Sequence, residues 1–388
     1  MRNLSCLLIT ICLSLHLYAQ HNIVPVFISG TEGHKSYRIP AIIQVINGDL
    51  LAFAEGRVNG SGDFGDINIV LKRSNDQGRT WSSIETIVDY NNLQAGNPAP
   101  VVDLLDPKYP EGRIFLFYNT GNNHEGEVRK GNGLREVWYK TSVDNGKSWS
   151  EPVNITLQVH KPNQSNTNPE YNFKEDWRHY ANTPGHALQF EYLPYKGRIY
   201  IAANHSEGTP QKNDNDYFAH GFYTDDHGKS FKLSETVNLP GSNECNVAEL
   251  SNGRLMLNAR NQKGDIRARI VAISKNGGET WDSIYFDYKL PDPVCEGTIL
   301  NIGKMQGKNI LAFCNAADIK ERNNLTLRIS KDEGLTWKNS YPIDKNPEKK
   351  KSDFTAYSDI VKISNDRIGV LYERNDYSQI VFKTVKWK

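Results

Sequence analysis

The sequence predicts an all-β protein, and two repeated patterns lead to that prediction. The first pattern, S/T-x-D/N-x-G-x-T/S-W/F, occurs five times along the chain. The second consists of a strand-like run, a turn and another strand-like run, and it recurs six times. Such regular repetition indicates one supersecondary unit that is used many times. The five copies of the first pattern span residues 74–81, 142–149, 224–231, 274–281 and 330–337.

The copy at 330–337 shows what this eight-residue pattern predicts. Asp332 can accept hydrogen bonds from the backbone N–H groups of a tight turn, as Asx residues do. Gly334 can adopt a positive φ angle at little cost, and Trp337 supplies a large apolar anchor. An alternating run at 325–329 precedes the copy, as expected for a strand. Each copy therefore predicts a turn between two antiparallel strands.

Six pairs of strand-like segments, joined by turns rich in Gly, Asn and Asp, define the larger unit. The first segments are 37–45, 97–104, 186–191, 244–251, 296–302 and 357–363. The second segments are 50–55, 114–119, 199–204, 255–260, 310–315 and 368–373. In the first five units a third strand leads into the eight-residue pattern, and a fourth has room to follow it. Six four-stranded antiparallel units in series predict a six-bladed β-propeller.

The two ends of the predicted ring need one further strand. The last unit has three evident strands, the third at 379–385, and the early run 23–28 can supply the fourth and close the ring. Residues 157–178 are polar and irregular and predict a long loop at the rim. No linker or shift in composition divides the chain, so we expect a single domain at 21–388.

The bulk composition excludes several classes of protein. The chain has 388 residues, with 46 Lys and Arg against 45 Asp and Glu, which gives no reason to expect a nucleic acid or an anionic membrane as partner. Cys245, Cys295 and Cys314 form neither a disulfide framework nor a metal-ligand motif. We therefore expect no metal, no other cofactor and no membrane insertion.

The first twenty residues differ from the rest. Arg2 precedes an apolar run at 4–17 that ends near Ala19, which is typical of a secretory signal peptide at 1–20. A retained membrane anchor is an alternative, but the run is short for one. We expect a secreted or periplasmic monomer; association with the cell surface stays open.

The predicted topology gathers polar residues at one rim. In an antiparallel hairpin the first strand starts where the second ends, and the third strand also starts there. A cluster of arginines at one rim needs an anion between its members, and guanidinium groups bind carboxylates or phosphates in a bidentate way. The residues predicted at this rim are Arg38, Glu55, Arg57, Asp63, Glu244, Arg260, Arg322, Tyr357 and Glu373.

Each of these residues also has an ordinary explanation when it is taken alone. A single arginine is usually a solvated surface charge, and Tyr357 would be a strand aromatic. Beside Glu244, however, the Tyr357 phenol can lose its proton as it attacks, like other activated nucleophiles. Asp63, in the glycine-rich segment 60–66, is either a turn former or an acid/base on a mobile loop, and Asp66 is its rival for that role.

These motifs together resemble the exo-sialidase (neuraminidase) family. Tyr37-Arg38-Ile39-Pro40 matches the F/Y-R-I-P motif, and the five eight-residue patterns match the Asp boxes of that family. Asp boxes alone are weak support because unrelated secreted proteins carry them. The resemblance covers essentially all of the mature chain. Further matching segments are 54–57, 244–249, 257–260 and 356–359.

The resemblance implies a six-bladed propeller that removes terminal sialic acids from glycoproteins, glycolipids and oligosaccharides with retention of configuration. It places the nucleophile on Tyr357, its base partner on Glu244 and the acid/base on Asp63. The arginines that grip the sugar carboxylate fall on Arg38, Arg260 and Arg322.

The resemblance also implies supporting residues around the sugar. Glu373 matches a glutamate that orients the first arginine, and Arg57 and Asn97 match residues near the sugar's C4 and N-acyl groups. Glu125 and His205 fall near further pocket positions.

The chemistry of sialic acid explains a tyrosine nucleophile. The sugar carries its carboxylate on the anomeric carbon, which would repel a carboxylate nucleophile; sialidases are a known exception to the two-carboxylate rule of glycosidases. Three alternatives remain at this stage. They are a trans-sialidase or intramolecular trans-sialidase, a catalytically silent sialic-acid-binding propeller, and an enzyme for another nonulosonic acid with a hydroxyl in place of the N-acyl group.

Overall fold

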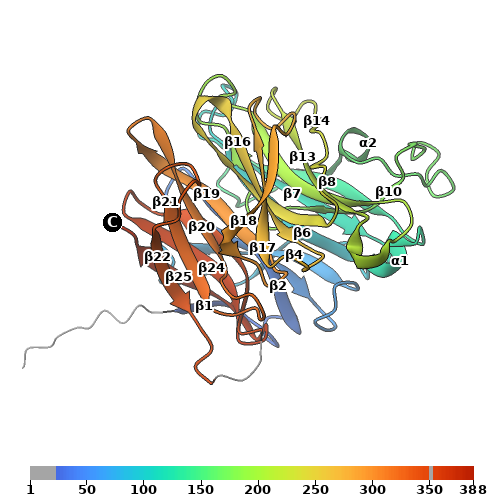
Figure 1. Ribbon diagram of the computed structural model, residues 1–388. Coiled ribbons are helices and arrows are strands. Elements are labelled where there is room, and N and C mark those ends of the chain that lie inside the picture. Colours follow the sequence, from blue (N-terminus) through green and yellow to red (C-terminus); the bar gives the residue numbers. More distant parts are fainter. Residues whose placement is uncertain (1–22, 349–352) are drawn as a thin grey trace, which may run out of the picture.

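The computed structural model describes residues 23–348 and 353–388 and confirms an all-β fold (Figure 1). Helical structure among these residues is limited to α1 (Glu125–Arg129), α2 (Thr156–Val159) and two 3₁₀ turns, Lys212–Asp214 and Ser251–Gly253. Within the described part of the chain, no helix combines the length and the apolar character needed to cross a membrane. The predicted signal peptide lies outside the described residues.

The strands form antiparallel sheets of similar design. The first and last strands of the chain share a sheet of order β1-β25-β24-β23. Its strands are Val24–Ile28 (β1), Thr355–Lys362 (β23), Arg367–Arg374 (β24) and Gln379–Lys386 (β25). The next two sheets have the orders β15-β16-β17-β18 and β19-β20-β21-β22. Their strands are Ser242–Glu249 (β15), Leu255–Asn261 (β16), Ala268–Ser274 (β17), Ser283–Pro291 (β18), Gly297–Met305 (β19), Lys308–Ala316 (β20), Leu325–Ser330 (β21) and Asn339–Asp344 (β22).

Two larger sheets complete the molecule. A five-stranded sheet has the order β10-β12-β13-β14, with β11 beside β12, and an eight-stranded sheet has the order β2-β3-β4-β6-β7-β8-β9, with β5 beside β4. The strands of the five-stranded sheet are Trp177–Asn182 (β10), Leu188–Gln189 (β11), Ile199–Glu207 (β12), Tyr217–Thr224 (β13) and Lys232–Leu233 (β14). The strands of the eight-stranded sheet are Ser36–Gln44 (β2), Leu50–Arg57 (β3), Ile67–Ser74 (β4), Glu85–Val88 (β5), Gln94–Asp103 (β6), Arg113–Gly121 (β7), Arg135–Ser142 (β8) and Val153–Asn154 (β9).

The sheet count differs from the prediction of six separate four-stranded sheets. Four sheets have the size of a blade, and the fifth has eight strands because β4 and β6 pair in parallel at Ile67 and Gln94. The predicted inner segment at 186–191 also differs, since the inner edge is β10 followed by the short β11. Pro184 lies between these two strands, and proline has no N–H group for the sheet ladder.

The sheets are arranged around a common axis. β2 contacts both β23 and β6, β6 contacts β10, and the sheet of β10 contacts β15 through β12. β15 in turn contacts β19, and β19 contacts β23, which closes the ring. The predicted closing strand is confirmed, because β1 pairs antiparallel with β25. The fold is therefore of the β-propeller type.

The five eight-residue patterns form the predicted turns. In the last copy, Asp332 accepts hydrogen bonds from the Thr336 N–H group at 2.8 Å and from the Thr336 hydroxyl at 2.6 Å. Gly334 has a φ of 87°, and Trp337 packs against Phe313 with ring centroids 5.9 Å apart. Each turn links the third strand of a unit to its fourth, on the rim opposite the predicted polar residues.

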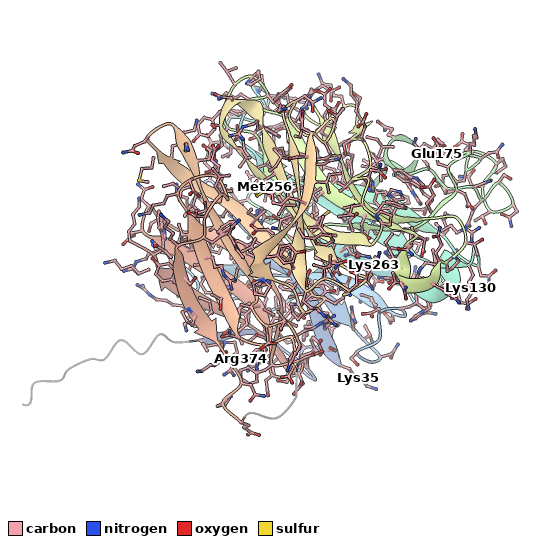
Figure 2. The ribbon with its side chains drawn as sticks, in the orientation of Figure 1. Lys35, Lys130, Glu175, Met256, Lys263 and Arg374 are labelled. Atoms are coloured by element: carbon pink, nitrogen blue, oxygen red, sulfur yellow. The ribbon has the colours of Figure 1, made fainter. Side chains whose placement is uncertain are left out.

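The apolar core lies between neighbouring sheets rather than at one centre. One buried cluster joins β6, β7 and β8 to the sheet of β10, and another joins β20 and β21 to β23, β24 and β25. Figure 2 shows the side chains on the ribbon, with Lys130 at the end of α1 and Arg374 at the end of β24. The ring is therefore held together by apolar contacts between neighbouring sheets.

Candidate active site

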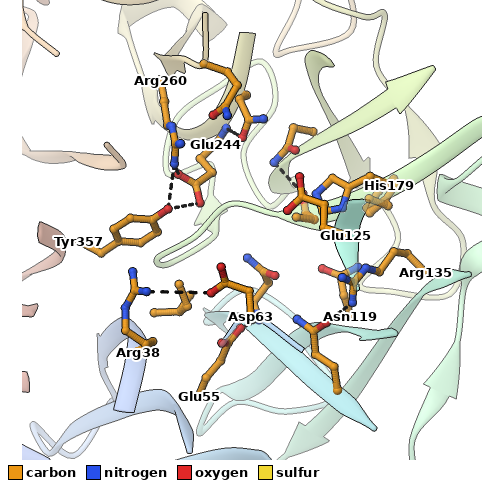
Figure 3. Close-up of a pocket in the computed structure, with 18 of the residues that line it drawn as sticks. Arg38, Glu55, Asp63, Asn119, Glu125, Arg135, His179, Glu244, Arg260 and Tyr357 are labelled. Carbon is orange, nitrogen blue, oxygen red and sulfur yellow. Dashed lines mark hydrogen bonds and ion pairs between the residues drawn. The ribbon is translucent and has the colours of Figure 1, made fainter. Parts of the chain in front are cut away.

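A polar pocket of about 200 Å³ opens at the rim that the topology predicted. Figure 3 shows its two sides, with Tyr357 and Arg260 on one and Glu125, Arg135 and His179 on the other. The side chains come from the starts of first and third strands, the ends of second strands and the adjoining loops. The charged and tyrosine residues that line it are Arg38, Glu55, Arg57, Asp63, Glu125, Arg135, His179, Tyr180, Glu244, Arg260, Arg322 and Tyr357.

Bulges in the inner strands aim several of these side chains. The register of β2 shifts between Arg38 and Ala41, and that of β6 shifts between Gly96 and Ala99. Within these bulges Ile39 has a φ of 58° and Asn97 a φ of 54°. A positive φ is unfavourable for a β-branched residue such as Ile39, so the surrounding structure must hold it there. Bulges beside a site are a common means of redirecting side chains.

Buried carboxylates hold both bulges. Glu373 Oε1 accepts hydrogen bonds from the Ile39 N–H group at 2.9 Å and from Arg38 Nε at 2.6 Å. Its other oxygen, Oε2, accepts a hydrogen bond from the Tyr357 N–H group at 3.2 Å. Glu55 plays the same part in β6, where its Oε1 atom accepts from the Asn97 N–H group at 3.0 Å. Strained backbone and side chains of the pocket are thus held by the same carboxylates.

Three arginines converge at one end of the pocket, which we call the arginine end. Arg38 pairs with Glu373, and Arg260 Nη1 lies 2.7 Å from Glu244 Oε2. Arg322 donates to the Tyr377 hydroxyl at 3.1 Å. No carboxylate of the described residues lies within ion-pair distance of Arg322. An unpaired guanidinium at a pocket wall favours the binding of an anion.

Tyr357 and Glu244 lie beside these arginines and contact each other. The Tyr357 hydroxyl donates to Glu244 Oε1 at 2.5 Å and accepts from Arg260 Nη1 at 3.0 Å. Burial raises the pKa of the Tyr357 phenol well above its ordinary value, and the negative charge of Glu244 raises this pKa further. The phenol is therefore neutral at rest, with a carboxylate in place to take its proton.

Asp63 lies at the mouth of the pocket on the loop between β3 and β4. Its Oδ1 atom is 2.7 Å from Arg57 Nη1 and 4.0 Å from Arg38 Nη1, while 67% of its side chain is exposed. Burial raises the pKa of the Asp63 carboxyl, but the positive charges of Arg57 and Arg38 outweigh this effect and lower it overall. In the empty pocket the Asp63 carboxyl is therefore ionised. Asp66, its rival in the sequence, does not line the pocket.

The opposite side of the pocket is a polar wall made by Asn119, Glu125, Arg135 and His179. Glu125 comes from α1 and accepts a short hydrogen bond from the Tyr217 hydroxyl. Burial raises the pKa of Glu125, but its polar and positive neighbours, led by His179, outweigh burial and lower it to about 2. The wall therefore carries a fixed carboxylate beside the Arg135 guanidinium.

His205 does not reach the pocket. Its ring stacks on Trp177 with centroids 3.5 Å apart, and its Nδ1 atom lies 3.1 Å from Nδ1 of His220. Burial lowers the pKa of His220 to about 3 and places the pKa of His205 well below its ordinary value. Four histidines behind and along the polar wall form what we call the histidine cluster: His160, His179, His205 and His220.

The structure brings together the residues that the sequence singled out. Eight of the nine line the pocket, and Glu373 lies directly behind Arg38. The sequence analysis missed Tyr377, whose ring lies 4.0 Å from the Arg38 guanidinium carbon, and three members of the polar wall. Arg135 starts a third strand, so the topological rule that placed Asp63 and Arg322 could have found it. No sequence signal marks Tyr377.

One other cluster has the composition of a metal site. Ligand atoms of Asp103, Asp106 and His227 lie within 4.8 Å of one another. Arg113 Nη2 already pairs with Asp106 at 2.9 Å and lies 3.8 Å from Asp103. An arginine among the carboxylates neutralises their charge, so the geometry describes a salt-bridge network.

Comparison with known proteins defines the class. A family model described as a BNR repeat-like domain matches residues 48–371. The chain belongs to this family. A sialidase of Micromonospora viridifaciens is 30% identical over 377 residues, which cover 92% of this chain and 52% of that protein. A sialidase of Bacteroides fragilis is 28% identical over 384 residues, which cover 93% of this chain and 64% of that protein.

The chain thus spans between half and two thirds of the length of these curated relatives. Among solved structures, the Hadza microbial sialidase Hz136 superposes with a TM-score of 0.76 at 25% identity, covering 94% of this chain and 68% of that one. A leech intramolecular trans-sialidase superposes with a TM-score of 0.71 at 17% identity, covering 94% of this chain and 70% of that one, which supports the fold. The resemblance to exo-sialidases drawn from the motifs is confirmed.

Proposed function

We propose that this chain is a retaining exo-α-sialidase that hydrolyses terminal sialic acids from glycans through a sialyl-tyrosine intermediate. One observation carries the proposal: the Tyr357 hydroxyl donates to Glu244 at 2.5 Å at the end of the pocket where Arg38, Arg260 and Arg322 converge. A binding protein without activity has no need of a buried phenol paired with a carboxylate. The sialidase relatives that match nearly the whole chain support the same activity.

Binding begins with the sugar carboxylate at the arginine end. Arg322 has donors free of carboxylate partners, while Arg38 and Arg260 are held in place by Glu373 and Glu244.

The first chemical step forms a bond from the Tyr357 oxygen to the anomeric carbon. Glu244 takes the phenol proton as the bond forms, so no full negative charge meets the substrate carboxylate. The bond to the leaving oxygen breaks, and Asp63 donates a proton to that oxygen. The arginine end stabilises the substrate carboxylate while positive charge develops on the ring.

Asp63 must be protonated for this step, and substrate binding favours that change. Arg57 and Arg38 hold the Asp63 pKa low in the empty pocket. A substrate carboxylate at Arg38 offsets part of that positive charge and so raises the pKa of Asp63. After the aglycone leaves, the ionised Asp63 takes a proton from water as the water oxygen attacks the anomeric carbon. The bond from that carbon to the Tyr357 oxygen breaks, and Glu244 returns its proton to this oxygen, so Tyr357 is released as the phenol.

Substitution of Tyr357 tests the proposal. Tyr357→Phe removes the attacking oxygen and keeps the ring, and we expect turnover of a fluorogenic sialoside to fall at least about a thousandfold. Tyr341→Phe is the matched control, because its hydroxyl donates to the Trp387 carbonyl, far from the pocket. Turnover by Tyr357→Phe close to the wild-type rate would remove Tyr357 from the mechanism. Product analysis separates hydrolysis to free sialic acid from transfer or formation of an anhydro sugar.

We further propose that the ring has six blades. The eight-stranded sheet divides into two four-stranded units if the single β4–β6 pair is counted as a contact between blades.

We also propose that these blades form one catalytic domain at 21–388. A signal peptide at 1–20 precedes this domain and directs a monomer to the periplasm or the medium. Amino-terminal sequencing and light scattering of the exported protein test these points; a retained residue 1 or a stable dimer would contradict them.

A further inference from the structure

The polar wall faces one particular position of the sugar. In the pyranose ring of a nonulosonic acid the carboxylate is on C2, and C5 is the ring carbon directly across from it. When the arginine end holds the carboxylate, the C5 substituent points away from Arg38, Arg260 and Arg322. Figure 3 shows what lies on that side: Asn119, Glu125, Arg135 and His179.

Polar atoms of this wall are buried and have no protein partner. Arg135 is 3% exposed, and its Nε atom makes no hydrogen bond. The same holds for Nδ1 of His179, which is 8% exposed, and for Oδ1 of Asn204, which is 0% exposed and also lines the pocket. Buried polar groups are usually paired. These atoms are themselves hidden from solvent, so a ligand contacts the exposed parts of the same side chains, and the wall favours polar ligand groups over apolar ones.

The fold reserves space for the Arg135 guanidinium. A Cβ atom at Gly121 would lie 1.8 Å from Arg135 Nη1, so a larger residue at this position of β7 would displace the guanidinium from its present place. Arg135 also bonds to the Gln94 side chain, which lines the pocket as well.

Carbon surface is scarce on this side of the pocket. Ile39 packs with Tyr357 at the arginine end, which leaves Tyr180 and Ala181 as the apolar residues of the opposite side. The Tyr180 hydroxyl is itself engaged by His220. An N-acyl group would bring a methyl group against charged and polar atoms that lose water without gaining hydrogen bonds, which is unfavourable. An acylamino group also donates through its N–H and accepts through its carbonyl, but a hydroxyl group does both without adding a methyl group.

We infer that the polar wall binds a hydroxyl group on C5, so that this site prefers a nonulosonic acid with a C5 hydroxyl over one with a C5 acylamino group. The inference rests on the proposed function, because it takes the arginine end as the carboxylate site. The glycerol chain of the sugar also suits a polar wall, but it is the same in both sugars. A comparison that changes only C5 therefore isolates the wall's preference.

The test compares the 4-methylumbelliferyl α-glycosides of N-acetylneuraminic acid and of its deaminated analogue, which carries the C5 hydroxyl. We expect kcat/KM of the full chain to be at least about tenfold higher for the deaminated glycoside, since unpaired buried polar groups discriminate strongly. Arg135→Leu should reduce that ratio toward one or reverse it. Arg198→Leu, which removes a buried arginine on the opposite rim, should leave the ratio unchanged.

A second measurement tests the preference for a C5 hydroxyl group independently of the proposed hydrolase activity. The rise in melting temperature of the wild-type protein with each free sugar reports binding without turnover. Stronger stabilisation by the deaminated sugar without turnover of either glycoside would support the inference and reject the hydrolase. Turnover of both glycosides with an equal or greater kcat/KM for the N-acetyl form would overturn the inference and leave the hydrolase standing. If neither glycoside is turned over and neither free sugar stabilises the protein, both the inference and the hydrolase proposal are wrong.

Discussion

Replacing Glu373 with glutamine tests how the site is held together. The glutamate is 0% exposed and accepts three hydrogen bonds, from Arg38, from the strained Ile39 backbone and from the Tyr357 backbone. Glutamine keeps the shape of the side chain but loses its charge and turns one oxygen into an NH₂ group. At least one of the three N–H donors then faces the new NH₂ group, which cannot accept a hydrogen bond. Arg38 also loses the negative charge that pairs with it.

The expected loss follows from the burial of the pair. Removing one partner of a buried ion pair costs about 3–5 kcal/mol, because the remaining charge stays buried without compensation. For a chain of this length we expect Glu373→Gln to lower the melting temperature by about 4 to 6 °C. Since the same carboxylate positions Arg38 and Tyr357, we also expect kcat/KM to fall at least about tenfold.

Thermal unfolding followed by circular dichroism measures the first effect, and steady-state kinetics well below the melting temperature measure the second. Glu111→Gln makes the same chemical change at an exposed turn and should alter neither quantity. A Glu373→Gln protein that melts within about 1 °C of the wild type and keeps its kcat/KM would refute this account.

Three further outcomes are expected. Arg322→Met should raise KM about 10- to 100-fold with little change in melting temperature, because Arg322 pairs with no described carboxylate; an unchanged KM would exclude it from substrate binding. Asp332→Ala should lower stability by about 1–2 kcal/mol in urea unfolding but leave kcat unchanged, since its turn lies on the opposite rim, and a large loss of kcat would contradict that placement. Stability should also decrease as the pH falls from about 6.5 to about 3, the pKa to which burial lowers His220. In that pH range the histidines of the cluster bind protons in the unfolded chain but not in the folded protein, so acid favours unfolding. Urea midpoints that stay constant from pH 7 to pH 4 would contradict this prediction.

Much of the candidate site was accessible from the sequence because its positions follow from local rules. Alternation located the strands, and hairpin geometry then placed Arg38, Glu244, Arg260 and Tyr357 at one rim. The same rule applies to Arg135 at the start of β8, although the motifs did not draw attention to it. A residue placed by a strand end can be found without knowledge of its spatial neighbours.

Other features depend on how the sheets pack around the axis. Tyr377 contacts both Arg38 and Arg322, which are distant in sequence, and no local pattern predicts that meeting. His205 matched a pocket position by its place along the chain, but its side chain packs into the histidine cluster instead. The pairing of β4 with β6 likewise depends on how closely two units approach each other.

The sequence by itself determined the repeated antiparallel unit, the five turns and the rim that carries the arginines and Tyr357. These depend on backbone hydrogen bonds and on side-chain alternation within a few residues, which a linear pattern records. The tertiary structure alone decided which side chains face each other across the pocket, including the polar wall opposite the arginine end. That arrangement arises from radial packing between sheets, where groups far apart in the chain are desolvated together and must pair with one another or with a ligand.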